Sequence, residues 1–365
     1  MANDKKTPLF DEHVRLNALM APFAGYSMPI HYGSIIEETK ITRSGCAIFD
    51  ISHMGEIMVQ EDPSNCSLDR AITVPVTKMK EGGCKYGFLL NENGTAIDDL
   101  IVYRIKNDEW MIVVNASNEV RDYETIKSRL APSAKIQNIS DDSAKFDVQG
   151  PAAYDVMKKI AGTGLAELKY FTFKKFPLLG EDRIISRTGY TGELGFEVYL
   201  NNKNAAAFWN EAVKNGAVPA GLGSRDILRS EAGLPLYGDE LTEDITPVEA
   251  GMEKFIDFEK KFIGKAALLK QIETGVEKKL CGFKIDGRRT PRHSSPILKD
   301  GAAIGTVSSG VFSPHLNCGI GMGYVKPQYA EIGTTFEIDL GRGTAAATVA
   351  QMPFLKSASI RMTLK

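Results

Sequence analysis

The sequence predicts an α+β protein of two to three domains that ends in an all-β module. The chain has 365 residues, which is longer than a domain with a single hydrophobic core usually is. Helix and strand signals alternate through the first two thirds of the chain. From Lys279 onward, short strands are separated by Gly, Pro and Ser turns, which is typical of a small barrel or jelly roll. We therefore expect a domain boundary near residues 271–279.

Composition and charge exclude several classes of protein. The 44 Lys and Arg residues nearly balance 46 Asp and Glu residues, so the chain has no net positive charge that would attract nucleic acid or an anionic membrane. Apolar residues never run long enough to span a bilayer. The polar start, residues 1–7, resembles neither a signal peptide nor a transit peptide. We expect a cytoplasmic protein that binds neither nucleic acid nor membrane.

Cysteine and histidine give no metal signature. The five cysteines form no C-x-x-C pair, and the five histidines form no H-E-x-x-H motif. The cysteines are Cys46, Cys66, Cys84, Cys281 and Cys318. We expect reduced cysteines and no bound metal.

The first 150 residues predict helices between antiparallel strands. Ser34 and Glu37 form a capping box for a helix that should stop at Gly45. Ser117 is expected to cap a second helix, with Val120 among the residues of its apolar face. The predicted strands are 56–60, 87–91, 97–105 and 110–115, and the polar turn 106–109 makes the last two a hairpin.

The middle of the chain continues in the same style. Strands are predicted at 184–191 and 195–200, and a helix at 205–215 is expected to end at Gly216. Ser224 is expected to cap a short helix that runs to Glu231. Thr246 and Glu249 form a second capping box, which predicts another helix.

The C-terminal module reads as strands throughout. Gly319, Gly321 and Gly323 resemble a phosphate loop, but no helix follows them, so they predict tight packing between strands. The cluster of Arg288, Arg289, Arg292 and His293 fits a solvated hairpin better than an RNA-binding surface. The predicted strands are 280–285, 301–311, 319–325, 335–340 and 345–354.

Three segments carry polar residues suited to chemistry. Asp98 and Asp99 are consecutive on a strand, so one carboxylate must face the packed side unless the strand lies at a wet edge. Asn115 ends the neighbouring strand. The loop 187–197 combines glycines with Tyr190, Glu193 and Glu197. The helix predicted after Gly221 carries four charged residues, which ion pairs within the helix would also explain: Arg225, Asp226, Arg229 and Glu231.

Together these segments resemble the aminomethyltransferase, or T-protein, family of the glycine cleavage system. The resemblance follows the chain in order over nearly its whole length. Its stretches are TPLF (7–10), FDISHMGE (49–56), IDDLIVY (97–103), VNASN (114–118), VQGP (148–151), SRTGYTGELGFEVY (186–199), GLGSRDILRSEAGLPLYGDELTEDITPVEAG (221–251), RTPRHSSPI (289–297), IGTVSSG (304–310) and MPF (352–354).

The resemblance implies a three-domain cloverleaf around a central folate crevice. Two α/β domains with antiparallel sheets would be joined by a C-terminal β-barrel or jelly-roll-like domain. The first domain would be discontinuous, comprising residues 1–49 and 140–270, the inserted second domain would be 50–139, and the third 279–365. The implied reaction passes the methylene of the aminomethylated lipoyl arm of H-protein to tetrahydrofolate and releases ammonia, with no metal and no flavin.

The resemblance also assigns residues. Asp99 matches the catalytic aspartate, with Asp98 as its outward-facing neighbour. Glu197 matches the carboxylate that accepts the donor edge of the pterin, and Tyr190 should stack or bond nearby. The remaining matches to folate-site positions are Met54, Tyr86, Asn115, Arg225 and Arg361.

Departures from the family pattern are small. Ser224 and Ile227 replace Ala and Thr, and Tyr26 replaces a Trp. Two alternatives remain open on the sequence. One is a tetrahydrofolate-dependent demethylase built on the same scaffold, and the other is a non-catalytic folate-binding assembly factor or RNA-linked module.

Overall fold

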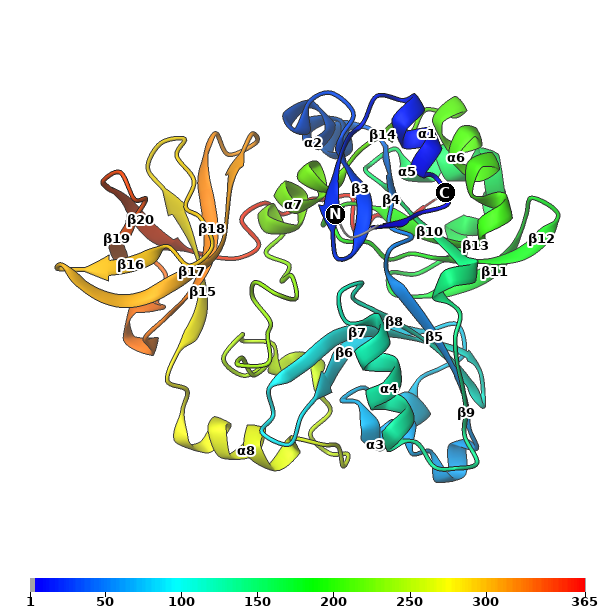
Figure 1. Ribbon diagram of the computed structural model, residues 1–365, viewed down its shortest axis with the longest axis horizontal. Helices are drawn as coiled ribbons and strands as arrows, with labels where there is room; N and C mark the ends of the chain where they lie inside the picture. The colour runs from blue at the N-terminus through cyan, green and yellow to red at the C-terminus, as the bar shows by residue number, and fades with distance from the viewer. Residues whose placement is uncertain (1–3, 365) are drawn as a thin grey trace.

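The computed structural model describes residues 4–364 and shows three lobes (Figure 1). Two lobes are each built on a sheet with helices against it, and the third is a closed barrel. This arrangement is the α+β fold with antiparallel sheets and a terminal barrel that the sequence predicted. No helix among these residues combines the length and the apolar character needed to cross a bilayer.

The first lobe holds a six-stranded sheet in the order β11-β12-β13-β10-β4-β14, antiparallel except where β14 joins β4. Helices α5 and α6 pack on one face, where Phe146, Phe208 and Trp209 are fully buried. The strands are β4 (Ala47–Asp50), β10 (Ser143–Gln149), β11 (Phe173–Leu178), β12 (Glu181–Ser186), β13 (Gly195–Asn201) and β14 (Val218–Pro219); the helices are α1 (Phe10–Arg15), α2 (Ile35–Ser44), α5 (Ala153–Ala161), α6 (Ala205–Lys214) and α7 (Leu222–Glu231); a small sheet adds β1 (Lys5–Lys6), β2 (Leu19–Phe23) and β3 (Tyr26–His31).

The second lobe is a fully antiparallel sheet in the order β6-β7-β8-β5-β9. One face is covered by α3 and α4 around Leu100, Val102 and Ile126. The other face, with Ile101 and Tyr103, packs against Phe173 of the first lobe. The elements are β5 (Gly55–Gln60), β6 (Cys84–Leu90), β7 (Ala96–Lys106), β8 (Glu109–Val114), β9 (Lys135–Asn138), α3 (Leu68–Ala71) and α4 (Glu119–Arg129).

The third lobe is a six-stranded barrel that closes through the pairing of β15 with β20. The glycines of β18 permit close strand contact, because a Cβ on Gly321 would lie 2.6 Å from both Phe283 and the Ser309 carbonyl. This confirms the packing interpretation of that glycine run. The barrel strands are β15 (Lys279–Ile285), β16 (Pro296–Lys299), β17 (Ala302–Ser313), β18 (Cys318–Val325), β19 (Thr335–Asp339) and β20 (Thr344–Ala350). Helix α8 (Lys265–Thr274) precedes the barrel in the chain and lies beside the second lobe, where Leu268 packs with Phe88 and Leu90 (Figure 1). The 3-10 helices, spread over the three lobes, are η1 (Pro63–Asn65), η2 (Val76–Lys78), η3 (Ser140–Asp142), η4 (Thr163–Glu167), η5 (Asn202–Asn204), η6 (Glu253–Phe255) and η7 (Pro327–Tyr329).

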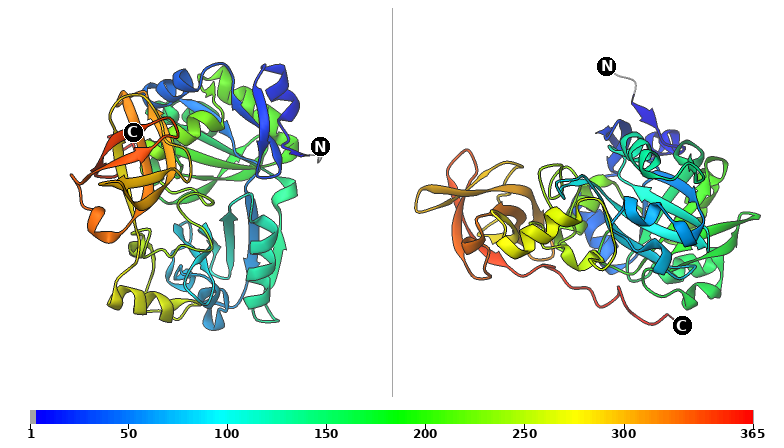
Figure 2. Two further views of the ribbon diagram at one scale, coloured as in Figure 1. Left: turned by 60° about the vertical axis from the view of Figure 1, so that its left-hand side comes forward. Right: turned by 90° about the horizontal axis from the view of Figure 1, so that it is seen from below.

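The chain end returns from the barrel to the first lobe, as the right-hand view of Figure 2 shows. The Leu355 amide donates to the Glu231 carbonyl at 2.9 Å. The Ser359 hydroxyl donates to the Glu193 carboxylate, and Arg187 donates to the Met362 carbonyl at 2.6 Å. Residues 355–362 therefore act as a strap between the barrel and the first lobe.

Several predicted helix starts are wrong. The helix after Ser117 begins at Glu119 with Asn118 at its N-cap position, and Val120 is 67% exposed rather than packed. Ser224 lies inside α7, which begins after Gly221, and it hydrogen-bonds Glu38 instead of capping the helix.

The second capping box forms without its helix. The Thr246 hydroxyl and the Glu249 carboxylate exchange the expected hydrogen bonds with each other's backbone amides. Only a turn follows, because Gly251 takes a left-handed conformation with φ of 66° and the chain changes direction. By contrast, Ser34 caps α2 through the Glu37 amide, and α2 ends at Gly45 as predicted.

Candidate functional site

The carboxylate of Asp99 is held from two sides. Asp99 lies on β7, where its side chain shares a face with Ile101 and Tyr103 and so turns toward the first lobe. Its Oδ2 accepts a hydrogen bond from the Tyr86 hydroxyl at 2.8 Å, and its Oδ1 accepts one from the Asn115 amide at 2.8 Å. Tyr86, Asn115 and Asp99 therefore form one cluster, as the sequence grouped them.

The prediction that Asp98 faces outward is wrong. Its side chain is wholly buried, because it shares the face of Leu100 and Val102 that α4 covers. Its Oδ1 accepts from the side-chain amides of Asn115 and Asn118, both at 2.9 Å, and its Oδ2 accepts from the Asn115 backbone amide at 2.9 Å. Neither face of β7 points into bulk water at this position.

The surroundings of Asp99 adjust its proton affinity. Burial, reinforced by the negative charge of Asp98, raises the pKa of Asp99 to about 7, against the opposing effect of the Tyr86 and Asn115 hydrogen bonds. A carboxyl group with this pKa exchanges its proton near neutral pH, which suits a group that must hold charge and also move a proton.

A second cluster surrounds Glu197 on β13. The Lys145 ammonium lies 3.0 Å from Glu197 Oε1, and the hydroxyls of Tyr103 and Thr188 donate to Oε2, the former at 3.2 Å. Burial opposes the ionisation of Glu197, but Lys145, the Thr188 hydrogen bond and the charge of Arg225 together hold the pKa of Glu197 below its ordinary value. Met54 joins this cluster, with its sulfur 3.7 Å from the Lys145 ammonium.

Tyr190 and Arg225 lie between the two clusters. The Arg225 guanidinium stacks 4.7 Å from the centre of the Tyr190 ring and is 2.5 Å from Asp147, which pairs directly with Glu197 across the strands. Burial, with the charge of Asp99 added, raises the pKa of Tyr190 above its ordinary value. Tyr190 is therefore linked to both clusters.

Arg361 lies on the strap, apart from the two clusters. Arg361 is exposed, and its guanidinium lies 5.6 Å from the centre of the Tyr170 ring. Tyr170 in turn stacks edge-on against Phe171, which packs with the residues beneath the Glu197 cluster. The structure therefore brings seven of the eight predicted residues into linked clusters and leaves Arg361 at the margin.

The sequence reasoning missed several charged residues of this region. Lys145 and Asp147 are fully buried and contact Glu197 and Arg225, respectively. A signal was available, because apolar residues alternate with Lys145, Asp147 and Gln149 along β10, so the polar set shares one face. His53 is also buried, and burial, followed by the charge of Arg225, lowers its pKa to about 3.

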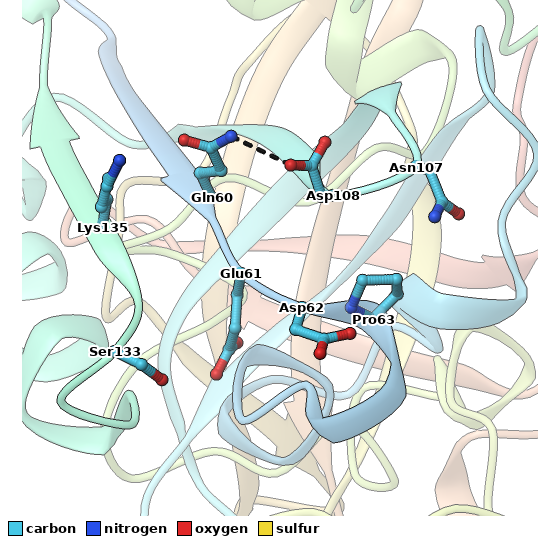
Figure 3. Close-up of a pocket in the computed structure, with 8 residues that line it drawn as sticks. All are labelled: Gln60, Glu61, Asp62, Pro63, Asn107, Asp108, Ser133 and Lys135. Carbon is cyan, nitrogen blue, oxygen red and sulfur yellow. Dashed lines mark hydrogen bonds between the residues drawn. The ribbon is translucent and has the colours of Figure 1, made fainter.

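A separate hollow of about 480 Å³ lies on the second lobe, away from these clusters, where β5 ends (Figure 3). Its carboxylates are already satisfied: Glu61 accepts from Ser67 and from the Leu68 amide, and Asp62 accepts from Ser64. We therefore place the candidate site at Asp99 and Glu197 instead. Within residues 4–364, no three His, Cys, Asp or Glu side chains group as a metal site would require.

Comparisons with known proteins agree along the whole chain. The family model described as GCVT N-terminal domain matches residues 9–260, and the one described as glycine cleavage T-protein C-terminal barrel domain matches residues 278–356. A curated protein of Thermoanaerobacter pseudethanolicus named aminomethyltransferase is 42% identical over 363 residues, covering 98% of the chain and 99% of that protein. One of the same name from Bacillus mycoides is 39% identical over 359 residues, covering 96% and 98%.

The fold has a solved counterpart. The crystal structure of glycine cleavage system aminomethyltransferase T from Bartonella henselae is similar with a TM-score of 0.92 and 31% sequence identity. Each of the two chains covers 100% of the other.

Proposed function

The chain belongs to the glycine cleavage T-protein family of aminomethyltransferases, and we propose that it transfers a methylene group from H-protein to tetrahydrofolate. The donor is the S-aminomethyl-dihydrolipoyl arm, S–CH₂–NH₃⁺. The methylene forms two new bonds to folate nitrogens, while its bonds to sulfur and to nitrogen break. The products are 5,10-methylenetetrahydrofolate, ammonia and the dihydrolipoyl thiol.

The residues of the two clusters fit a reduced pterin. Each carboxylate oxygen has two acceptor positions, and Lys145, Tyr103 and Thr188 occupy three of the four on Glu197, so one position on Oε1 remains for the donor edge of a pterin. Tyr190 and Met54 offer an aromatic ring and a thioether for its faces, and Arg225 supplies positive charge. We assign Met54, Tyr86, Asn115, Tyr190, Glu197, Arg225 and Arg361 to folate binding.

Asp99 is the proposed catalytic residue. Tetrahydrofolate supplies the nucleophilic nitrogen of the reaction. A fixed carboxylate beside the methylene stabilises the positive charge that develops there, and it accepts a proton from an amine. Tyr86 and Asn115 hold both oxygens of Asp99 in place, so little reorganisation is needed when charge develops. This doubly held carboxylate is the observation that carries the proposal.

We also propose that the lobes correspond to three domains, comprising residues 1–49 with 140–270, residues 50–139, and residues 279–365. The sheet of the first lobe takes its strands from both sides of the second-lobe segment, which supports an inserted second domain.

The direct test is to incubate the purified protein with aminomethylated H-protein, with and without tetrahydrofolate. Ammonia and 5,10-methylenetetrahydrofolate should form together, and the release of ammonia should slow greatly when tetrahydrofolate is omitted. Small methylated amines and sulfonium compounds serve as alternative donors in parallel reactions. If one of these small donors reacts and aminomethylated H-protein does not, the result would contradict the proposal and indicate a demethylase.

A further inference from the structure

The buried carboxylate of Asp98 meets three amide N–H donors and acts as an acceptor toward each of them. Two of these donors belong to Asn115, through its backbone and its side chain, and the third is the Asn118 side chain. A carboxylate suits this place because it offers acceptors at both oxygens, whereas a carboxamide would direct an N–H₂ group at one of the donors.

Asn115 connects the two neighbouring aspartates. Its side-chain nitrogen donates to Asp98 Oδ1 at 2.9 Å and to Asp99 Oδ1 at 2.8 Å, so both hydrogens of the amide are used on carboxylates. The opposite orientation of the amide would place its carbonyl oxygen against two carboxylates. Asp98 therefore fixes which end of Asn115 faces Asp99.

We propose that Asp98 is a positioning residue for the transfer reaction, acting on Asp99 through the Asn115 amide. The inference rests on the proposed function, because it concerns the orientation of the catalytic carboxylate. Asp98 cannot reach a substrate itself, since it is wholly buried beneath α4. Its influence on the reaction is carried by one shared amide group.

The charges around Asp99 come from several elements. Tyr86 faces it from β6, Asp98 adjoins it on β7, and Tyr190 lies near it from the loop before β13. On α4, the buried Asp122 lies against Asp98 and its charge also reaches Asp99. Arg121, also on α4, donates a hydrogen bond to the Tyr237 hydroxyl, and the charge of Asp98 reaches Tyr237.

The test is Asp98→Asn, studied by steady-state kinetics and by ¹³C NMR titration of labelled aspartate. The kcat should fall by about tenfold to hundredfold because the Asn115 amide loses its orienting acceptor, while the KM for tetrahydrofolate should change little. The titration midpoint of Asp99 should move to lower pH because the neighbouring negative charge is gone. Asp182→Asn, an exposed position on β12, is the matched control.

A double-mutant cycle with Asn115→Ala tests the route of the effect. Because Asp98 acts through Asn115, adding Asp98→Asn to Asn115→Ala should lower kcat no further. An equal loss in both backgrounds, or an unchanged kcat and midpoint in Asp98→Asn, would overturn the proposal. If Asp98→Asn does not fold, Asn118→Ala replaces it in the cycle, with an expected kcat loss of roughly two- to tenfold that disappears in the Asn115→Ala background.

The NMR readout separates the two proposals. The titration of Asp99 requires no turnover, so the coupling of Asp98 to Asp99 is measured even in an inactive protein. A wild-type protein that forms no 5,10-methylenetetrahydrofolate would refute the proposed function alone. An active enzyme in which Asp98→Asn leaves both kcat and the midpoint of Asp99 unchanged would refute the positioning role alone.

Discussion

Lys145 and Glu197 form an ion pair with 3.0 Å between nitrogen and oxygen, in a place where neither side chain is more than 5% exposed. The two residues lie on adjacent strands of the first-lobe sheet, on the face that also carries Asp147. Removing one partner of such a pair leaves the other charge buried without compensation. The pair is therefore needed both for the stability of the sheet and for the charge state of Glu197.

Replacing Lys145 with Met should weaken folate binding and destabilise the protein. Glu197 loses the ammonium that favours its ionised form, so its pKa should rise and its acceptor capacity for the pterin should fall. The expected loss of stability is about 3–5 kcal/mol, measured by urea denaturation, together with a raised KM for tetrahydrofolate. Lys175→Met, at an exposed position of β11, should change neither quantity. An unchanged KM in Lys145→Met would contradict the role of Glu197.

Replacing Asp99 with Asn should abolish transfer with little effect on folate binding. The amide keeps the size of the side chain but cannot balance positive charge, and we expect kcat to fall by about 10²–10³-fold. Single-turnover reactions with aminomethylated H-protein measure the rate, and equilibrium titration with tetrahydrofolate measures binding. A near-normal rate would remove Asp99 from the mechanism, and normal binding with no transfer would argue against a non-catalytic folate-binding protein.

The pH dependence should report the ionisation of Asp99. Because the proposed role of Asp99 requires its ionised form and its pKa is raised to about 7, kcat/KM should rise with pH and reach half of its maximum near pH 7. Below that pH the rate should fall about tenfold per unit, since the ionised fraction of Asp99 falls about tenfold per unit. A profile that stays flat down to pH 5 would show that Asp99 ionises far more readily than its surroundings imply.

Asp122 should make the stability of the protein depend on pH. Burial, followed by the negative charge of Asp98 and a hydrogen bond with its carboxylate, raises the pKa of Asp122 to about 11. The folded state therefore keeps a proton that the unfolded state releases above about pH 4. The stability that this proton contributes is lost as the pH rises from about 4 toward the folded pKa of about 11. Asp122→Asn carries no such proton and should become more stable than the wild type as the pH rises.

The difference between Asp122→Asn and the wild type should grow by up to about 1.4 kcal/mol per pH unit between pH 5 and pH 8. Urea denaturation at several pH values measures it, and Asp182→Asn should show no such trend. A constant difference across this range would mean that folded Asp122 is ionised.

Local patterns in the sequence predicted much of the fold. The strand-like runs 97–105 and 110–115, with the polar turn at residues 106–109 between them, correctly predicted the hairpin of β7 and β8. Ser34 correctly predicted the start of α2. Short elements without such patterns, such as β16, were not predicted. The Thr246 capping box shows the limit of this reasoning, because a local hydrogen-bond motif forms whether or not a helix continues beyond it.

The site was predicted in outline, and its missing members have a common cause. The resemblance gave Asp99, Tyr86 and Asn115, which lie together. The prediction for Asp98 was wrong because the pattern of the strand does not show which element covers each of its faces. That depends on how α4 packs against the sheet. Lys145 was overlooked because a single Lys on a strand usually points to solvent, and only the tertiary fold brings it to Glu197.

The strap of residues 355–362 sets an order of assembly. These residues follow the strands of both the first-lobe sheet and the barrel in the chain, so a nascent chain can complete the sheet of the first lobe and close the barrel before Ser359 reaches Glu193. The strap therefore joins two lobes whose own strands are all synthesised before it, and its contacts with the first lobe form only after the barrel strands have been made.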